Sequence, residues 1–190
     1  SRLVSEGFTR GFYYRPRVDY ALLKKYSGGL IALSACLSGD LPKLLLDGRD
    51  NEAREMAQRY VDIFGPGNFY VELQDHGIPE EKQVLPRLVR LAREMDIPLV
   101  VTNDCHYLTA ADADAQEVLM CIQTGKTLSD PNRMKMTTRE LYVKGEDEMR
   151  ALFPNFPEAI ENTAKIAARC QVDFDFSTTH LPKFPLPEGE

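Results

Sequence analysis

The sequence has no apolar run long enough to cross a membrane, and it carries no secretory signal. A membrane-spanning helix needs about 20 consecutive apolar residues, and the runs here are much shorter. The opening SRLVSEG lacks the cationic start and apolar segment of a signal peptide. It also lacks a starting Met, so we expect a piece of a longer protein. With 190 residues, 43% of them hydrophobic, the chain can bury the core of about one domain.

Cysteine is scarce and shows no paired spacing. The four cysteines are Cys36, Cys105, Cys121 and Cys170, and no two of them form a C-x-x-C motif. Nothing in the sequence is typical of a secreted protein, so we expect reduced thiols and a cytoplasmic location. One of the four thiols is then free to serve as a metal ligand.

Positive charge is in deficit overall, but not at the N-terminus. The net charge of −6 argues weakly against a phosphate-binding surface. Residues 1–28 nevertheless contain six basic and two acidic residues, a net charge of +4, interleaved with six aromatic residues. Such a pattern is what a nucleic-acid surface can use, through phosphate contacts and base stacking. The alternative, aromatic side chains packed inside with solvated cations around them, is favoured by composition alone.

The middle of the chain alternates short apolar strands with amphipathic helices. This pattern predicts parallel strands joined by right-handed crossovers. Pro86 lies inside one of the helices and should kink or divide it. The expected strands are residues 30–36, 69–73 and 98–101, and the expected helices are 20–26, 41–46, 51–64, 79–95 and 112–121.

Potential metal ligands follow all three strands. Cys36 ends the first strand, Asp75 and His76 follow the second, and Asp104 and His106 follow the third. In an extended chain residues i and i+2 point to the same side, so Asp104 and His106 should project together. Ligands in parallel βα folds lie at the carboxyl ends of the strands. The sequence therefore predicts a site there, either a metal centre or an acid/base pair.

The character of the sequence changes after residue 122. Residues 122–144 are turn-rich and carry five basic against two acidic residues, and residues 134–143 are expected to form a strand or an extended arm. Residues 146–153 and 157–170 are expected to be helices. The stretch 177–190 contains three prolines and is typical of an extended linker.

Several stretches, taken in order, resemble one known family, the bacterial DNA polymerase III alpha subunit. The resemblance covers essentially the whole chain, and the motifs are specific in combination. They are EGFTRGFYYRPR at 6–17, GLIALSACLSG at 29–39, ELQDHG at 72–77, TNDCHY at 102–107, CIQTGKT at 121–127 and LPKFP at 181–185.

The resemblance implies an α/β fold, part of a distorted, TIM-like βα barrel of the PHP (polymerase and histidinol phosphatase) type. Residues 1–122 would be the C-terminal part of the PHP domain. Residues 123–176 would be the rest of that domain and a mainly helical connection toward the polymerase palm, and 177–190 a linker. Cys36, Asp104 and His106 match metal-ligand positions of the family, for zinc, manganese or magnesium. Asp75 and His76 match a motif, but we expect them to form a hydrogen-bonded turn.

The family implies two functional interpretations. In the first, the parent enzyme synthesises DNA, and its PHP region is a metal-dependent phosphoesterase that acts as a 3′→5′ proofreading exonuclease. The early H-x-H ligands and the palm carboxylates of the family are absent from this sequence. The fragment alone should therefore be inactive. In the second, the PHP region is a silent scaffold that supports the palm and docks replisome subunits. The expected partners are primer–template DNA, the sliding clamp, the exonuclease subunit and the clamp loader. An unrelated metal hydrolase with a βα fold is a third interpretation.

Overall fold

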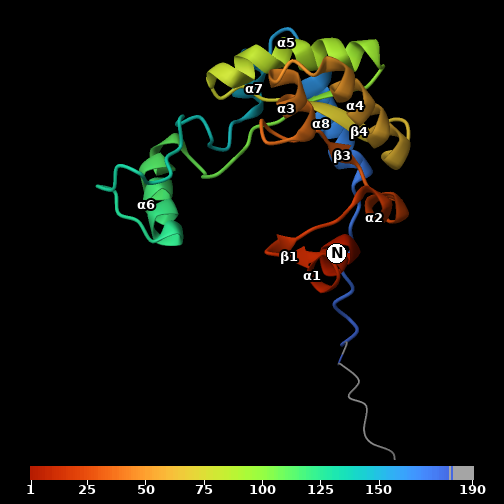
Figure 1. Ribbon diagram of the computed structural model, residues 1–190, viewed down its shortest axis with the longest axis horizontal. Coiled ribbons are helices and arrows are strands. Elements are labelled where there is room, and N and C mark those ends of the chain that lie inside the picture. The colour runs from red at the N-terminus through yellow and green to blue at the C-terminus, as the bar shows by residue number, and fades with distance from the viewer. Residues whose placement is uncertain (180, 182–190) are drawn as a thin grey trace, which may run out of the picture.

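The structure is a computed structural model that describes residues 1–179 and 181 (Figure 1). Helices predominate, and the strands are short. In chain order the elements are α1 (Arg2–Thr9), β1 (Phe12–Tyr13), β2 (Arg15–Pro16), α2 (Tyr20–Lys25), β3 (Ala32–Leu33), α3 (Asp40–Leu46), α4 (Asp50–Phe64), β4 (Phe69–Leu73), α5 (Pro79–Glu94), β5 (Leu99–Val101), the 3-10 helix η1 (Ala110–Asp112), α6 (Ala113–Thr124), α7 (Glu146–Leu152) and α8 (Pro157–Arg169).

The three predicted strands form one parallel sheet in the order β3-β4-β5. Ala32 pairs with Phe69, and Val71 pairs with Leu99. Each strand is linked to the next through helices, as the alternating pattern predicts. The first strand is shorter than expected, because only two of its residues pair with β4. This sheet and the β1–β2 hairpin are the strands of the described part of the chain, and they do not confirm the predicted barrel.

The core lies between the sheet and helices α3, α4, α5 and α8. Helix α3 packs on α4 and α5, and α8 packs along β5. Leu41, Val71 and Leu73 are completely buried there. Asn162 of α8 also donates a hydrogen bond to the carbonyl of Leu99, 2.8 Å away, so α8 satisfies a backbone group at the edge of β5.

Pro86 does not divide helix α5, so that part of the prediction is wrong. The helix runs without a break over its 16 residues. Val84 and Leu88, on either side of the proline, are 3% and 4% exposed. The burial of this apolar stripe outweighs the one backbone hydrogen bond that a proline removes.

Gly7, Gly11 and Pro16 predict a loop after the end of a helix over residues 1–18, and the structure has more regular elements there. This N-terminal segment forms α1 and then the antiparallel hairpin β1–β2, with Tyr14 at positive φ in the turn. Two glycines allow the close packing of this segment. A Cβ on Gly7 would lie 3.3 Å from the carbonyl oxygen of Arg17, and one on Gly11 only 2.0 Å from it. The glycines therefore serve close approach rather than a loop.

Aromatic side chains of the N-terminal segment are exposed, so the packed interpretation is wrong for four of the six. Phe8, Phe12, Tyr13 and Tyr14 are all more than half exposed. Arg17 lies over the Tyr13 ring, 5.3 Å from its centroid. The nucleic-acid interpretation of this surface stays a prediction.

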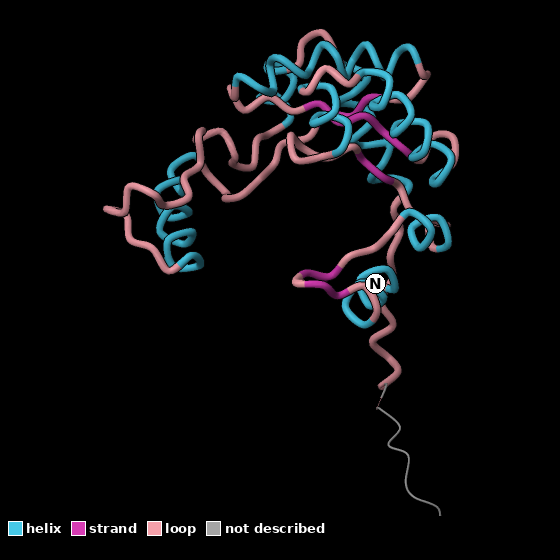
Figure 2. The backbone as a smooth tube through the Cα atoms, in the orientation of Figure 1, coloured by secondary structure: helices cyan, strands magenta, loops and turns pink. Residues whose placement is uncertain are grey.

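Helix α6 and the loops beside it extend away from the sheet (Figure 2). The predicted helix is present but runs three residues further, and Leu119 and Ile122 on it are exposed. Of the two alternatives predicted for 134–143, a strand or an extended arm, the structure has the arm. It has one isolated parallel bridge, between Tyr107 and Tyr142.

The C-terminal helices are confirmed as α7 and α8, with Pro157 in the first turn of α8. Residues 170–179 have no helix or strand. Most of the expected linker, 177–190, lies outside the described residues. In the part of the chain that the structure covers, no helix combines the length and apolar character needed to span a membrane.

Candidate metal-ligand cavity at the strand ends

The loops after β3, β4 and β5 meet at the carboxyl end of the sheet, where they surround one cavity of about 280 Å³. Cys36, His76, Asp104 and His106 all line it. Four of the five potential ligands predicted at the strand ends are therefore brought together. Asp75 is not among the lining residues.

A tight loop presents Cys36 to the cavity. Ala35 has a positive φ of 66°, and its N–H donates to Glu72 Oε2 at 2.9 Å. A Cβ on Gly39 would lie 2.3 Å from the carbonyl oxygen of Ser34, so only glycine fits there. The Cys36 side chain is half-buried as a result.

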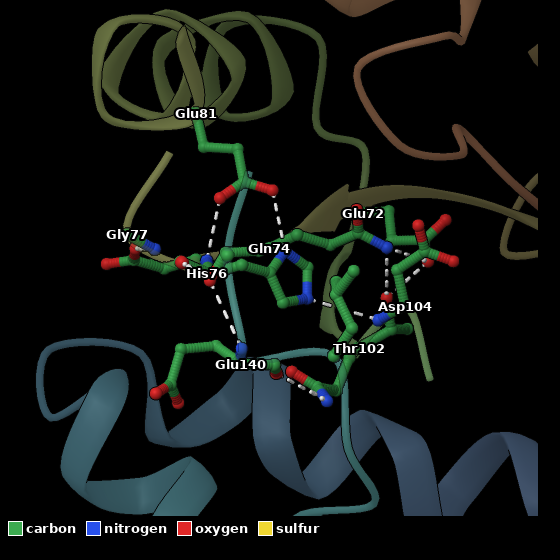
Figure 3. Close-up of polar contacts among 12 residues, drawn as sticks. Glu72, Gln74, His76, Gly77, Glu81, Thr102, Asp104 and Glu140 are labelled. Carbon is green, nitrogen blue, oxygen red and sulfur yellow. Dashed lines mark hydrogen bonds and ion pairs between the residues drawn. The ribbon is translucent and has the colours of Figure 1, made fainter. Parts of the chain in front are cut away.

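Buried Glu72 ties the three strand ends together (Figure 3). Its backbone N–H donates to Ser34 Oγ at 2.9 Å, and its carboxylate accepts from the Thr102 hydroxyl. Gln74 adds hydrogen bonds to Thr102 Oγ1 and Glu72 Oε1, at 3.0 and 3.3 Å. A charged side chain at this position is stable because each carboxylate oxygen has a protein donor.

Asp104 and His106 project together, as the i, i+2 spacing predicts. Asp104 Oδ2 and His106 Nε2 are 3.4 Å apart, and both side chains are partly exposed. The arm over 134–143 supports this loop from outside, because the N–H of His106 donates to the carbonyl of Leu141 at 2.8 Å. The pair is thus a preformed carboxylate–imidazole unit at the cavity mouth.

His76 and Asp75 form the hydrogen-bonded turn that we predicted. Asp75 Oδ1 accepts from the N–H of Gly77 at 2.9 Å. Buried His76 pairs with buried Glu81, Nδ1 to Oε1 at 2.6 Å. Burial raises the pKa of Glu81, but hydrogen bonds from the side chain and backbone of His76 outweigh it and hold that pKa below its usual range.

The donor types suit a divalent metal, but their arrangement does not hold one by itself. Thiolate, carboxylate and neutral imidazole are common zinc ligands. Within residues 1–179 and 181, however, no three His, Cys, Asp or Glu side chains are grouped closely enough to hold an ion. The cavity therefore supplies part of a ligand set at most.

Sequence reasoning missed the groups that support the cavity. Glu72 could have been found, since it is the one charge in the strand FYVEL. Glu81 follows His76 by five residues in the first turn of α5, which is a weaker signal. Lys135 and Thr138 line the cavity from the arm, and no local pattern indicates that.

Comparison with known proteins agrees with the motifs. The model of the PHP domain family matches residues 1–76. The DNA polymerase III subunit alpha of Treponema pallidum is 49% identical over 97% of this chain, and those of Deinococcus radiodurans and Thermus aquaticus are each 42% identical over 99%. The chain spans 16%, 14% and 16% of the lengths of these three relatives. The predicted resemblance is confirmed: over nearly its whole length, this chain matches one segment of bacterial DNA polymerase III alpha subunits.

Proposed function

We propose that this chain is a segment of the alpha subunit of a bacterial replicative DNA polymerase, and that the intact protein carries out DNA-directed DNA synthesis. The similarity over 97% of the chain to such a subunit carries this proposal. Residues 1–122 would be the C-terminal part of the PHP domain, 123–176 its remainder and the connection to the palm, and 177–190 a linker. In the intact domain the β3–β5 sheet would be part of a PHP barrel.

Within that protein, Cys36, Asp104 and His106 would contribute ligands to a site for zinc, manganese or magnesium. Their shared position around one cavity supports this role. Since the described residues form only part of a ligand set, the remaining ligands would come from elsewhere in the intact protein. The activity that we propose for the complete site is phosphodiester hydrolysis, as a 3′→5′ proofreading exonuclease.

A scaffold without its own chemistry is the second candidate. It is favoured by the absence of any group of three metal ligands among residues 1–179 and 181. In this case the PHP region would support the palm and dock the clamp, the exonuclease subunit or the clamp loader. Both candidates place the protein with primer–template DNA in the cytoplasm.

Metal content separates the two candidates. The experiment measures the metal content of the intact protein and of Asp104→Asn by elemental analysis. Exonuclease assays on a mismatched primer are run on the same two proteins. For the nuclease, metal and mismatch removal should both fall strongly in Asp104→Asn, because an amide is a poor substitute for a ligating carboxylate.

Asp75→Asn is the matched control. It changes a carboxylate at the end of β4 that does not line the cavity, and the amide keeps an oxygen to accept from Gly77. It should therefore retain both metal and activity. A wild-type protein with neither metal nor nuclease activity supports the scaffold. Metal retained in full by Asp104→Asn would contradict Asp104 as a ligand.

A further inference from the structure

A buried histidine without a role in the proposed metal site lies under the loop that carries two of the proposed ligands. The side chain of His76 is 1% exposed, and that of its partner Glu81 is 5% exposed. Both carboxylate oxygens of Glu81 are used on His76: Oε1 meets Nδ1 at 2.6 Å, and Oε2 accepts the backbone N–H at 2.7 Å. This double contact fixes the orientation of the imidazole (Figure 3).

The other ring nitrogen of His76 faces the loop over residues 102–106, which carries Asp104 and His106 and is called the ligand loop below. Nε2 accepts the backbone N–H of Asp104, at 3.2 Å. An imidazole that accepts at Nε2 and meets a carboxylate at Nδ1 is neutral, with its proton on Nδ1. With both ring nitrogens engaged, His76 has no lone pair free for a metal, although it lines the cavity.

His76 also connects the ligand loop to the arm. The Thr138 hydroxyl donates to the His76 carbonyl at 2.7 Å, and Thr138 Oγ1 accepts from the N–H of Glu140 at 3.1 Å. The same arm holds His106 through the carbonyl of Leu141. One buried turn therefore contacts the start of α5, the ligand loop and the arm.

We propose that His76 is a positioning residue: its imidazole, oriented by Glu81, holds the Asp104 backbone and so sets the places of Asp104 and His106 at the cavity. For its effect on metal this inference rests on the proposed function, whereas the contact itself does not. Groups that orient ligands in this way typically change metal affinity by about 10–100-fold when they are removed.

Two substitutions separate the two ring nitrogens. In His76→Asn the amide nitrogen occupies about the place of Nδ1, so the bond to Glu81 can remain while the acceptor for the Asp104 N–H is lost. In His76→Gln the longer side chain brings an oxygen to about the place of Nε2, so that acceptor is restored. Asp75→Asn, next in the chain and outside the cavity, is the control.

The first measurement is hydrogen–deuterium exchange by mass spectrometry on the intact protein, with metal removed by a chelator. His76→Asn should accelerate exchange in the peptide that spans residues 102–106, and His76→Gln should return it toward wild type. Unchanged exchange at 102–106 in His76→Asn overturns the proposal. If His76→Asn does not fold, Glu81→Asp takes its place, because the shorter side chain loses its reach to Nδ1. Glu81→Asp should accelerate exchange at 102–106, and unchanged exchange there also overturns the proposal.

The second measurement is a zinc titration of the intact proteins. Affinity should fall by about 10–100-fold in His76→Asn, and stay near wild type in His76→Gln and Asp75→Asn. An equal loss of zinc affinity in His76→Asn and His76→Gln overturns the positioning role. The loss would then not depend on whether an acceptor for the Asp104 N–H is present. If the wild type binds none of zinc, manganese and magnesium, the proposed metal site fails, while the exchange experiment still decides the contact between His76 and Asp104.

Discussion

The cavity at the strand ends and the N-terminal segment hold their polar and aromatic side chains in opposite ways. At the cavity, Glu72, His76 and Glu81 are buried, and each is fixed by hydrogen bonds from other elements. In the N-terminal segment, Phe12 and Tyr14 are more than half exposed and contact mainly their neighbours in the chain. Both regions stand out in the sequence. The buried groups of the first are held by contacts between distant residues, whereas the rings of Phe12 and Tyr14 stack on neighbours in the chain.

The consequence is a difference in what a substitution should do. Removing a buried, hydrogen-bonded group leaves its partners without an acceptor and without access to water, which costs about 1–3 kcal/mol for each partner. Replacing an exposed side chain usually changes stability by less than about 0.5 kcal/mol. Mutations in the two regions should therefore fall into two classes.

At the cavity, the largest effect is expected for Glu72→Ala. The substitution leaves the N–H of Ala35 and the Thr102 hydroxyl without their acceptor, so we expect a loss of about 2–4 kcal/mol in the free energy of unfolding. Urea denaturation measures it. Glu72→Gln keeps one oxygen acceptor and should lose clearly less. A loss below 1 kcal/mol in Glu72→Ala would mean that the carboxylate does not hold the strand ends together.

A smaller effect, dependent on pH, is expected from Glu81. Its pKa is lower in the folded chain than its ordinary value of 4.5, because the hydrogen bonds from His76 outweigh burial. The unfolded chain therefore binds the proton more readily, and stability rises with pH through this range. The contribution is complete above the unfolded pKa and is lost as the pH falls toward the folded one.

Glu81→Gln should reduce the rise of the free energy of unfolding with pH. Urea denaturation at several pH values between 3 and 6 would detect this change. Glu80→Gln is the control, since Glu80 is exposed in the same turn of α5. The two variants should differ most above the unfolded pKa and converge as the pH falls. Parallel pH profiles for Glu81→Gln and the wild type would contradict the assigned role of the His76 hydrogen bonds.

The sequence predicts the parts of the site that depend on local patterns. Alternating strands and helices predict a parallel sheet, and the places of Cys36 and Asp104 follow from where two strands end. The turn at His76 is also a local feature. The contacts that shape the cavity are not local: Ala35 and Glu72 are 37 residues apart, and His76 and Thr138 are 62 apart. No periodicity in one sequence indicates such pairs.

The N-terminal hairpin is a second example of a structure that local sequence patterns do not predict. Gly7 and Gly11 predict a loop if they are judged by their local preference alone. In the folded chain both lie against the backbone at Arg17, a contact that only the tertiary structure defines. The local preference of glycine therefore indicates a turn, but not the close backbone contact that requires glycine here.

The smallest effect is expected for Tyr14→Asn. Tyr14 is 82% exposed and has a positive φ, a conformation that Asn adopts more readily than Tyr. The free energy of unfolding should change by less than about 0.5 kcal/mol. Tyr70→Asn is the contrast, because Tyr70 is 7% exposed on β4 and accepts from Arg169 at 3.1 Å, so its loss should cost about 3–5 kcal/mol.

A loss above about 1 kcal/mol in Tyr14→Asn would show that the hairpin surface is packed in solution, and the two regions would no longer differ. If stability is unchanged, the variant also tests the nucleic-acid interpretation of residues 1–28. Weaker binding of primer–template DNA by an equally stable intact protein would then come from the lost stacking surface rather than from the fold. Unchanged binding would leave the exposed tyrosine without a role in DNA recognition.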